Sequence, residues 1–376
     1  MSSPAVQESF SCHLLDGKVN LKDLLPEELE RFFGLLGEPR FRAGQVIRWM
    51  YVRGVSDFGH MTDLAKELRG RLQEIAVVPN LEADVQQLSE AQDTSKYLFR
   101  LPDGNAVESV RMRYLENLGP GRVAVCISSQ VGCAMACDFC ASGLLGLKRN
   151  LKTWEIVDQV TQIQNRVRDR GERVANVVFM GLGEPLHNYD NLLRAIRLIN
   201  LQEGLAIGMR HLTVSTAGLV PQITKLAQEK LSLCLAISLH ATDDELRGKM
   251  MPINRRWPIE QLLEACREYQ RLTDRRVTFE YLMIDGVNDS LEQARRLGSM
   301  VSGLHALINL IPWNPVEGIP YRRSTRAAVR AFQAEVEKYG VKCTVRQEKG
   351  SDIEAACGQL RLRDLGERAL PAQRAG

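Results

Sequence analysis

Apolar and polar residues follow two different patterns along the chain, and the first of them is helical. Between residues 21 and 76, short apolar stretches recur at helical spacing, for example at 45–51 and 64–72, with glycines between them. Pro26, followed by two acidic residues, is typical of the start of a helix. This pattern predicts a small helical domain at residues 21–76, preceded by a tail at residues 1–20.

Alternation at every second position marks the next segment of the chain. Apolar residues occupy alternate positions from Tyr97 to Leu101, just before the pair Asp103-Gly104. An Asp-Gly pair between alternating stretches is a strong signal for a tight hairpin turn. We therefore predict a short β-hairpin around this turn, within a linker that spans residues 77–118.

From about residue 121, apolar runs of strand length alternate with amphipathic helical segments. The predicted strands are Arg122–Ile127, Ala175–Met180, Leu212–Ser215, Cys234–Leu239, Val277–Leu282 and Ala306–Ile311. Helices separate them, and the helix at 153–168 should begin with Thr153 as its N-cap. Six strand–helix units predict an α/β fold with a parallel sheet. Because a closed barrel needs eight, we expect an open, partial (β/α)6 barrel at residues 119–348.

The carboxyl ends of these strands are where a functional site is expected. A last strand at Cys343–Arg346 should precede a C-terminal segment at residues 349–376. In parallel α/β folds, the loops after the strands gather at one end of the sheet and form the site. The segments that should meet there are 128–140, 181–186, 215–218, 238–240 and 312–315.

Composition changes this picture mainly through cysteine. Hydrophobic residues make up 44% of the 376 residues, charged residues 25%, and the net charge of +3 is too small to indicate a nucleic-acid partner. The chain has no run of ~18 apolar residues and no signal-peptide pattern at its start, so we expect a cytoplasmic protein without a membrane partner. Nine cysteines in a reducing compartment then indicate a metal, a redox role or burial.

Three of the cysteines lie within eight residues. Cys133, Cys137 and Cys140 have the spacing C-x3-C-x2-C directly after the first predicted strand of the barrel. Thiolates suit iron–sulfur clusters or zinc, but structural zinc normally has four ligands, and no fourth follows nearby. Three thiolates on a four-iron cluster leave one iron open to a small molecule. A zinc site completed by a distant residue is the alternative.

This motif, in this position, resembles the radical S-adenosylmethionine superfamily. The resemblance implies that the open iron binds S-adenosylmethionine and that an electron from one [4Fe-4S] cluster cleaves it to a 5′-deoxyadenosyl radical. The stretch Phe179-Met-Gly-Leu-Gly-Glu-Pro185 is similar to the glycine-rich strand of the superfamily, which meets the amino group of the cofactor. Gly183 would allow a close backbone approach, and Glu184 would accept from the ammonium group. An ordinary turn is the alternative.

Polar residues at other strand ends could complete the cofactor site. Ser215, Ser238 and His240 end the third and fourth strands, and Asn314 follows the sixth. Each alone is more often a solvated or capping residue, but together they suit ribose, carboxylate and adenine. We also expect Leu239, between two of these residues, to contact the cofactor.

Two further cysteines attract attention. Cys357 lies in a loop of small residues beyond the last strand, which suggests an accessible thiol, and Cys126 lies on the first strand, where burial is the simpler interpretation. We assign no role beyond packing to the remaining four, which are Cys12, Cys234, Cys266 and Cys343.

Six stretches of the chain resemble the RlmN/Cfr family of radical RNA methyltransferases. They are Cys126–Cys133, Gly146–Leu151, Met180–Leu186, Met251–Asn254, Gly286–Asp289 and Asp352–Leu360. The resemblance runs from about residue 20 to residue 362 and includes the helical domain at residues 21–76. Its arginines and the resemblance together predict that this accessory domain binds RNA. Leu182 departs from the methionine usual at its position, a conservative apolar exchange.

The family resemblance implies roles for the two extra thiols. Cys357 would take a methyl group from one S-adenosylmethionine, and a second molecule, cleaved at the cluster, would abstract hydrogen from that methyl group. The carbon radical would add to adenine, and Cys126 would then attack the sulfur and release the product through a transient disulfide. Glu108 matches the position of the family's proton acceptor. A solvated strand carboxylate is the other interpretation of Glu108, and Cys126 is a rival for proton removal.

The resemblance also implies the substrates and leaves one question open. The RlmN branch methylates carbon 2 of an adenosine in the peptidyl-transferase centre of 23S ribosomal RNA and of the adenosine 3′ to the anticodon in tRNA. An electron donor such as flavodoxin or ferredoxin is implied. We favour this branch over the Cfr branch, which methylates carbon 8 and confers antibiotic resistance. An RNA-binding protein with a vestigial cluster and a structural zinc protein are the interpretations from other classes.

Overall fold

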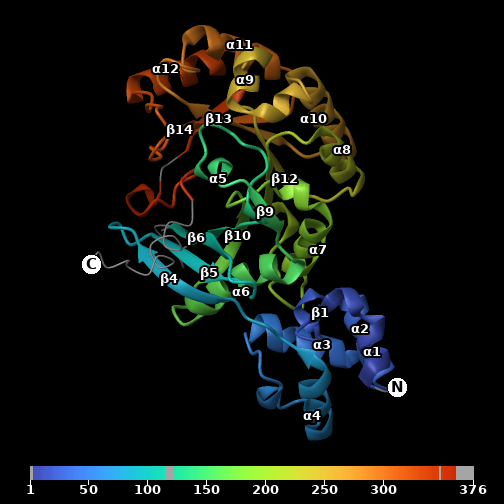
Figure 1. Ribbon diagram of the computed structural model, residues 1–376. Helices are drawn as coiled ribbons and strands as arrows, with labels where there is room; N and C mark the ends of the chain where they lie inside the picture. Colours follow the sequence, from blue (N-terminus) through green and yellow to red (C-terminus); the bar gives the residue numbers. More distant parts are fainter. Residues whose placement is uncertain (1–2, 115–121, 347–348, 361–376) are drawn as a thin grey trace, which may run out of the picture.

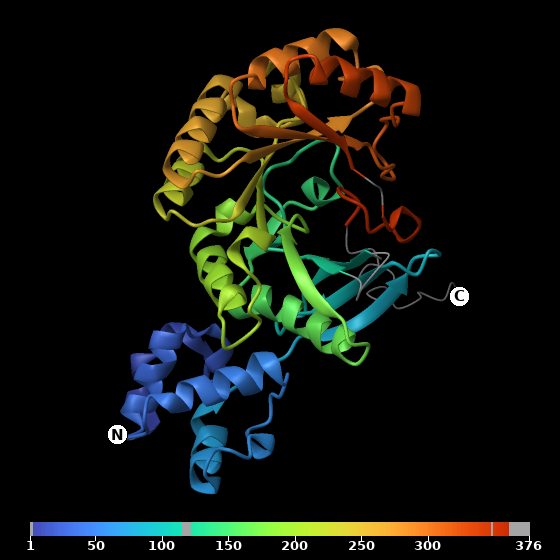
Figure 2. The same cartoon turned by 180° about the vertical axis from the view of Figure 1, so that it is seen from behind.

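The computed structural model describes residues 3–114, 122–346 and 349–360, apart from the side chains of residues 3–5, 84 and 85 (Figure 1). A small helical domain at the N-terminus lies at one end of a much larger α/β body (Figures 1 and 2). Within the described residues, no helix combines the length and the apolar character needed to cross a lipid bilayer.

The N-terminal domain is built from four helices and a small sheet. The helices are α1 (Ser3–Ser9), α2 (Pro26–Leu35), α3 (Phe41–Ile47) and α4 (Lys66–Ile75), and the strands are β1 (Leu14–Leu15), β2 (Lys18–Asn20) and β3 (Ala76–Val77). As predicted, α2 begins at Pro26, and the carboxylate of Glu28 accepts the backbone N–H of Leu25 at 2.7 Å. Single helical turns connect these elements, at η1 (Ser11–His13), η2 (Leu21–Asp23), η3 (Arg48–Val52) and η4 (Phe58–His60).

The first twenty residues fold with this domain and do not form the expected tail. Val6 and Phe10 are almost completely buried, and the Phe10 ring meets the edge of Phe32 with 5.7 Å between centroids. Apolar residues are spaced along this segment so that they can cover one side of α2. Their burial outweighs the entropy lost by ordering a short terminal segment.

A ten-stranded sheet forms the large body. Its parallel strands are β7 (Arg122–Cys126), β10 (Arg173–Phe179), β11 (Leu212–Thr216), β12 (Cys234–Ser238), β13 (Val277–Met283), β14 (Ala306–Pro312) and β15 (Lys342–Val345), adjacent in that order. Most of their apolar residues are buried, although alternate residues of β11 are only partly buried. Among the described strands, β4 and β15 form the two edges of the sheet and do not pair with each other, so the barrel is open, as predicted.

Three antiparallel strands extend this sheet beyond β7. The predicted hairpin is formed by β5 (Thr94–Arg100) and β6 (Ala106–Tyr114), and β6 pairs with β7. A strand that the sequence analysis missed, β4 (Glu82–Leu88), lies at the edge. A separate pair, β8 (Gln130–Gly132) and β9 (Leu147–Asn150), flanks the three-cysteine loop, which continues into the short helix α5 (Ala141–Leu144).

Helices cover the outer face of the curved sheet (Figures 1 and 2). They are α6 (Thr153–Arg168), α7 (Tyr189–Asn200), α8 (Val220–Gln228), α10 (Ile259–Thr273), α11 (Leu291–Val301) and α12 (Arg326–Glu337). Shorter elements lie in the connections, namely α9 (Asp244–Met250), η5 (Pro185–Asn188), η6 (Met209–His211), η7 (Pro252–Arg255) and η8 (Ser351–Ile353).

The N-cap predicted for α6 is displaced by one residue. Lys152, not Thr153, holds the N-cap position, and the Glu155 carboxylate accepts its backbone N–H at 2.8 Å. The hydroxyl of Thr153 is used elsewhere, because it donates to Asn191 at 3.0 Å. The carboxylate three residues into the helix thus replaces the hydroxyl cap that the sequence analysis expected.

A buried ion pair joins the N-terminal domain to the barrel. The ammonium of Lys22, 1% exposed, lies 2.5 Å from Asp158 of α6 and also donates to Asn80 at 2.6 Å. The second oxygen of Asp158 accepts the backbone N–H of Leu81 at 2.6 Å. Since both charges are buried and hydrogen-bonded, the pair fixes the domain, the connecting segment and α6 in one arrangement.

Candidate active site

A close backbone approach shapes the three-cysteine loop after β7. Gly132 has φ +75°, and a Cβ added there would lie 1.8 Å from the carbonyl oxygen of Gly146. The same oxygen accepts the N–H of Cys133 at 3.1 Å. Because a side chain cannot fit between these backbones, glycine is required at the residue before the first cysteine of the motif.

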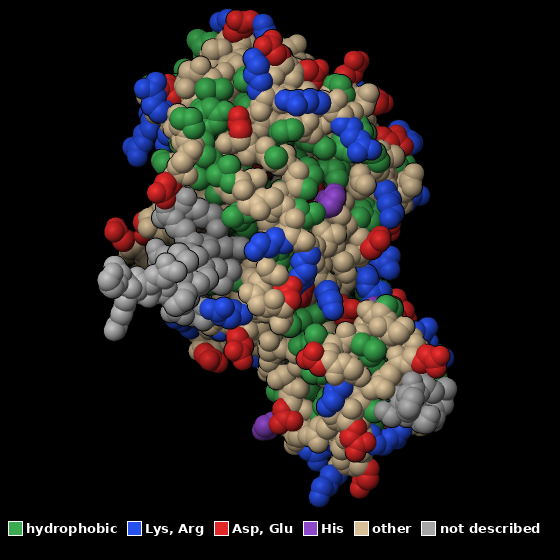
Figure 3. All heavy atoms as spheres, in the orientation of Figure 1, with side chains coloured by type: hydrophobic (Ala, Val, Ile, Leu, Met, Phe, Trp, Pro, Cys, Tyr) green, Lys and Arg blue, Asp and Glu red, His purple; other side chains and the backbone are tan. Residues whose placement is uncertain are grey.

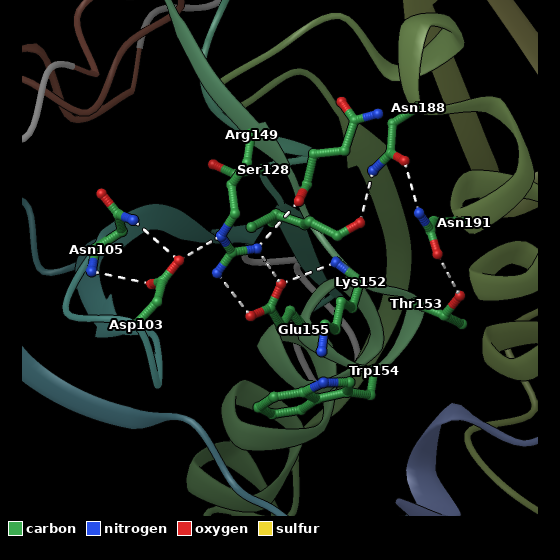
Figure 4. Close-up of polar contacts among 12 residues, drawn as sticks. Asp103, Asn105, Ser128, Arg149, Lys152, Thr153, Trp154, Glu155, Asn188 and Asn191 are labelled. Atoms are coloured by element: carbon green, nitrogen blue, oxygen red, sulfur yellow. Dashed lines mark hydrogen bonds and ion pairs between the residues drawn. The ribbon is translucent and has the colours of Figure 1, made fainter. Parts of the chain in front are cut away.

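An arginine on β9 anchors this region to its neighbours (Figure 4). Arg149 donates two parallel hydrogen bonds to Glu155 of α6, at 2.7 and 2.9 Å, and a third to Asp103 in the hairpin turn. Hydrogen bonding to Arg149 lowers the pKa of Asp103 to about 2. The planar guanidinium thereby links the hairpin, β9 and α6 with charge-assisted bonds of fixed geometry.

Cys133, Cys137 and Cys140 all line one cavity at the carboxyl ends of the strands. Burial raises the pKa of all three thiols, to about 12 for Cys133. Buried thiols favour the protonated form unless a cationic group binds them, and a metal cluster supplies that compensation. Three soft ligands in one wall of one cavity therefore fit an iron–sulfur cluster.

The glycine-rich turn after β10 places a buried carboxylate in the same cavity. Gly183 has φ +104°, and a Cβ there would lie 2.5 Å from the side chain of Gln130. The two oxygens of Glu184 accept the N–H groups of Leu186 at 3.0 Å and Ala217 at 2.7 Å. Burial raises the pKa of Glu184 to about 7, although these backbone donors oppose the shift. A cationic ligand group would stabilise the ionised carboxylate.

Ser215, Ser238 and His240 line this cavity, as the sequence predicted. The backbone N–H of Leu282 donates to Nδ1 of His240 at 3.1 Å, which leaves Nε2 to carry the proton of a neutral ring. Burial, together with the nearby charge of Arg247, lowers the pKa of His240 to about 3. The histidine is therefore a neutral polar wall of the cavity at physiological pH.

Two predicted cofactor contacts lie outside this cavity. Leu239 is fully buried and lines neither this cavity nor its neighbour, and its carbonyl accepts from Arg247 at 3.0 Å. Asn314 lines the neighbouring cavity and donates to the carbonyl of Cys357 at 3.4 Å. The linear order of residues did not reveal that the loop after β14 turns toward this second cavity.

Cys126 and Cys357 meet in the neighbouring cavity. Cys126, at the end of β7, is buried, and its burial, reinforced by the nearby Cys357, raises its pKa to about 12. Cys357, Met180, Ile311 and Arg346 line both cavities. The thiol of Cys357 therefore lies at the boundary between the space that the three cluster cysteines line and the space that contains Cys126.

Glu108 is buried on β6 but lines neither cavity. Its carboxylate lies 3.5 Å from the ammonium of Lys96, and its carbonyl accepts the hydroxyl of Ser128 at 2.6 Å. Val110, two residues further along, is on the same face of β6 and pairs with Cys126. Glu108 thus lies on the cavity-facing side of β6, farther from the C-terminal end of the strand than Val110, which lines the cavity.

The sequence analysis missed two charged residues of the site. Arg346, the residue after β15, is in the wall of both cavities, and the nearby Cys357 and the carboxylate of Glu280 raise its pKa. Glu280 lines the first cavity from β13 and accepts from Asn309 at 2.7 Å. A carboxylate inside the apolar run of β13 and an arginine at a strand end were both visible signals of a site.

The open parallel barrel, its three-cysteine loop and the cavity at its strand ends define a radical S-adenosylmethionine enzyme. The radical SAM superfamily matches residues 127–298, and the family described as the ribosomal RNA large subunit methyltransferase N-terminal domain matches residues 19–78. A protein of Thermoanaerobacter sp. (strain X514), named probable dual-specificity RNA methyltransferase RlmN, is 49% identical over 93% of this chain and 99% of its own length. The chain belongs to the RlmN family of S-adenosylmethionine-dependent RNA methyltransferases.

Other similar proteins agree with this assignment. A relative from Desulforamulus reducens with the same name is 49% identical over 94% of this chain and 98% of its own length. The crystal structure of a radical SAM methyltransferase from Sphaerobacter thermophilus has a TM-score of 0.86 and 44% identity, and it covers 91% of this chain and 99% of that one. The predicted family, the partial barrel and the enzyme class are therefore confirmed, and the superfamily implies a [4Fe-4S] cluster and S-adenosylmethionine.

Proposed function

We propose that the chain methylates carbon 2 of an adenosine in the peptidyl-transferase centre of 23S ribosomal RNA and of the adenosine 3′ to the anticodon in tRNA. The observation that carries this proposal is the position of Cys357, which lines both the cavity with the three cluster cysteines and the cavity with Cys126. The name that these relatives share, probable dual-specificity RNA methyltransferase RlmN, supports the proposal of two RNA substrates. Such RNAs would be met in the cytoplasm.

In this proposal, Cys133, Cys137 and Cys140 hold the [4Fe-4S] cluster. When bound and reduced by a donor such as flavodoxin or ferredoxin, the cluster supplies the electron that cleaves S-adenosylmethionine. Gly183, Glu184 and the polar side chains of Ser215, Ser238 and His240 then bind the cofactor, with the Glu184 carboxylate accepting from its ammonium group. Leu239 and Asn314 lie outside this cavity. Leu239 would therefore affect cofactor binding only through the neighbouring backbone, and Asn314 would contact the RNA in the cavity of Cys126 and Cys357.

Cys357 would carry the methyl group in this chemistry. Its thiol takes the group from one S-adenosylmethionine, and a second molecule, cleaved in each turnover, provides the radical that removes a hydrogen atom from the S-methyl group. The resulting carbon radical would add to the adenine and link the RNA to the protein. The adduct would then return its unpaired electron to the oxidised cluster and lose the hydrogen of carbon 2 as a proton. Since Cys126 lines the same cavity, its thiol can attack the Cys357 sulfur and release the methylated base as a disulfide forms.

Glu108 is the residue that we propose to accept the proton from the adenine ring. Its place on the cavity-facing side of β6 supports this role. Because Glu108 lies two residues before Val110, the partner of Cys126, either the adenine must reach toward Glu108 or β6 must shift to bring Glu108 to the adenine. Cys126 is the rival, because its thiolate would lie in the cavity itself. Comparing Glu108→Gln with Cys126→Ser for adduct breakdown would separate the two.

Nucleoside analysis tests the proposed function directly. The chain is expressed in cells that lack their own adenine-C2 methyltransferase, and purified 23S RNA and tRNA are digested and examined by mass spectrometry. We expect 2-methyladenosine in both RNAs and none from cells that express Cys357→Ala. The isomer 8-methyladenosine would identify the carbon-8 branch instead, and unmodified adenosine in both RNAs would refute the proposal.

A further inference from the structure

A hollow lined by three arginines lies outside the catalytic cavities. Acidic and basic side chains are interspersed on the visible face of the N-terminal domain (Figure 3), so this face has no strongly basic patch for RNA phosphates. Arg111, Arg113 and Arg170 line a space of about 370 Å³ together with Gln86, Asp93 and Ser95. That volume has room for roughly ten or more water molecules.

This arginine pocket and the cavity of Cys357 lie on opposite faces of β6. Val110, Met112 and Tyr114 line the cavity that contains Cys126 and Cys357. Arg111 and Arg113 alternate with them, so they point to the other face and line the arginine pocket. The C-terminal end of β6 therefore contributes residues to the walls of both the cavity of Cys357 and the arginine pocket.

Arg111 is a buried cation without a carboxylate partner among the residues that the structure describes. It is 3% exposed, and its one hydrogen bond goes to the neutral hydroxyl of Ser95 at 3.0 Å. Its Nε is buried without a partner, and no carboxylate among the described residues pairs with it. Burying an unpaired charge is costly, so such a residue usually serves a ligand of opposite charge.

The other charges of the arginine pocket leave it positive. Arg113 pairs with the buried carboxylate of Glu172, and Asp93 pairs with Lys349. In the described structure, the exposed guanidinium of Arg170 has no hydrogen bond or ion pair, so it adds to the charge of Arg111. Two uncompensated guanidinium groups in one hollow suit an oxyanion such as phosphate.

Lys349 connects the arginine pocket to the catalytic side. It lines the cavity of Cys357, and its ammonium reaches past the strand end to Asp93 and to the carbonyl of Arg113, 3.2 Å away. An RNA strand carries one phosphate per nucleotide. A strand that delivers a base to the cavity therefore brings phosphates to the same end of β6.

We propose that Arg111, Arg113 and Arg170 form a phosphate-binding pocket that holds a backbone phosphate of the RNA substrate. This inference rests on the proposed function, because it assumes that an RNA adenosine enters the cavity of Cys357. The pocket contributes affinity and orientation and takes no part in the chemistry. Phosphate contacts of this kind fix the register of a nucleic acid without reading its sequence.

The first test measures the affinity of the cluster-loaded enzyme for its substrate tRNA at several salt concentrations. Arg111→Met and Arg170→Ala should each weaken binding about tenfold at low salt. Each should also reduce the slope of log Kd against log salt by about 0.7 to 0.9, the value for one lost phosphate contact. Arg267→Ala, an exposed arginine on α10 that pairs with Glu264, is the matched control and should change neither quantity.

Thermal stability separates a ligand-binding arginine from a structural one. Because Arg111 has no charged partner in the described structure, Arg111→Met should leave the melting temperature of the RNA-free enzyme unchanged or raise it. A fall of several degrees would mean that Arg111 supports the fold and would overturn its role as a phosphate ligand. Arg170→Ala, at an exposed position, then decides the proposal alone through its effect on the salt slope.

Further measurements distinguish an RNA phosphate from free phosphate as the ligand. They also distinguish a failure of the pocket proposal from a failure of the proposed function. Inorganic phosphate, compared with chloride at equal ionic strength, should raise the melting temperature of the wild type but not of Arg111→Met. If it does so while both variants keep the wild-type salt slope for tRNA, the pocket serves free phosphate and the RNA assignment is wrong. If the wild type methylates tRNA and neither variant changes affinity, slope or phosphate response, the pocket proposal alone fails. If the wild type does not methylate RNA, the proposed function fails first.

Discussion

Cys357 faces two cavities, and at the scale of single residues this position gives its thiol two neighbours with different chemistry. On one side lie the three cysteines proposed to hold the cluster, and on the other lies Cys126. A thiol in such a place can be alkylated from one side and attacked by a second thiol from the other. The roles proposed for the two cysteines therefore depend on geometry that single substitutions can test.

Cys357→Ala should abolish RNA methylation while the iron content and the absorption spectrum of the cluster stay unchanged. The substitution removes the methyl-accepting sulfur but none of the three cluster ligands. Intact-protein mass spectrometry should show the mass of a methyl group on the wild type after incubation with S-adenosylmethionine and none on the variant. Cys234→Ala, whose thiol lines neither cavity, is the control and should behave as wild type. Methylated RNA at normal yield from Cys357→Ala would refute the carrier role.

Cys126→Ala should trap the enzyme on its RNA. Without the resolving thiol the covalent link between Cys357 and the adenine cannot be released, so a protein–RNA band should persist on a denaturing gel and vanish after ribonuclease treatment. The control is Cys266→Ala, which alters another buried thiol that lines neither cavity. Free 2-methyladenosine at wild-type yield would show that Cys126 does not resolve the adduct.

Glu184 should make the stability of the cluster-free protein depend on pH. Its folded pKa of about 7 lies above the ordinary 4.5, so the folded chain binds the proton more tightly than the unfolded chain. This contribution is complete below about pH 4.5 and is lost as pH rises through about 7. Between about pH 5 and pH 8 the loss is on the order of 2 to 3 kcal/mol.

Urea unfolding at both pH values checks this expectation with Glu184→Gln, which cannot titrate. The stability of the variant relative to wild type should increase from the lower to the higher pH by that amount. Glu264→Gln, at an exposed position on α10, should show no such change. An equal pH dependence in wild type and Glu184→Gln would contradict the raised pKa.

The sequence predicted which side chains share the cavity where their positions relative to the strand ends are sufficient to place them. The cluster cysteines, Glu184 and the polar strand ends share one cavity because the ends of parallel strands always meet. Leu239 and Asn314 were placed less well, because the direction of a side chain depends on how its loop turns after the strand. Arg346 and Glu280 were overlooked because only the fold shows that a carboxylate within one strand and an arginine at the end of another meet at one cavity.

At the scale of elements, the pairing of β8 with β9 depends on one glycine. Gly132→Ala adds a methyl group 1.8 Å from the carbonyl oxygen of Gly146, so the strand pair must separate and displace Cys133. We expect a loss of stability of several kcal/mol and a failure to retain iron. Gly104→Ala is the matched control, since its φ is also positive, at +80°, but nothing lies within 4 Å of the added atom.

Thermal unfolding and iron analysis of the two glycine variants provide the measurement. Gly104→Ala should cost only the backbone strain, about 1 to 2 kcal/mol, and should keep its iron. If Gly132→Ala loses no more stability than Gly104→Ala and binds a full cluster, the close approach does not organise the loop.

Elements were predictable in proportion to the strength of their patterns. The parallel strands have predominantly apolar runs, and their positions agree with the structure to within a few residues. β4 was missed because Glu82–Leu88 holds mostly polar residues, as an edge strand can. The N-cap of α6 was misplaced because Thr153 is the better capping residue by type, whereas Glu155 caps the helix in the structure.

At the scale of the whole molecule, the Lys22–Asp158 pair holds the N-terminal domain against the barrel. Lys22→Met would leave the Asp158 charge buried without its partner, which should cost about 3 to 5 kcal/mol of stability. Lys249→Met, which breaks an exposed pair with Glu245, should leave the stability almost unchanged, because solvent screens that pair.

Urea unfolding gives the two free energies, and limited proteolysis locates the change. The Lys22 variant should become sensitive near residues 77–81, the segment between the domain and the barrel, where Leu81 also depends on Asp158. A Lys22 variant as stable and as resistant as the Lys249 variant would mean that the buried pair does not fix the domain.

The antiparallel strands β4–β6 have a consequence for how the enzyme can be divided. The predicted domain boundary at residues 118–119 falls between β6 and β7, and the family match begins at residue 127, directly after β7, although β6, β7 and β10 pair in one continuous sheet. A fragment that began at the first point would expose the unpaired amide and carbonyl groups along β7, and one that began at the second would expose those along β10, in each case a template for aggregation. The smallest barrel fragment that could stay monomeric therefore begins near Glu82, so that the hairpin and its edge strand shield the catalytic sheet.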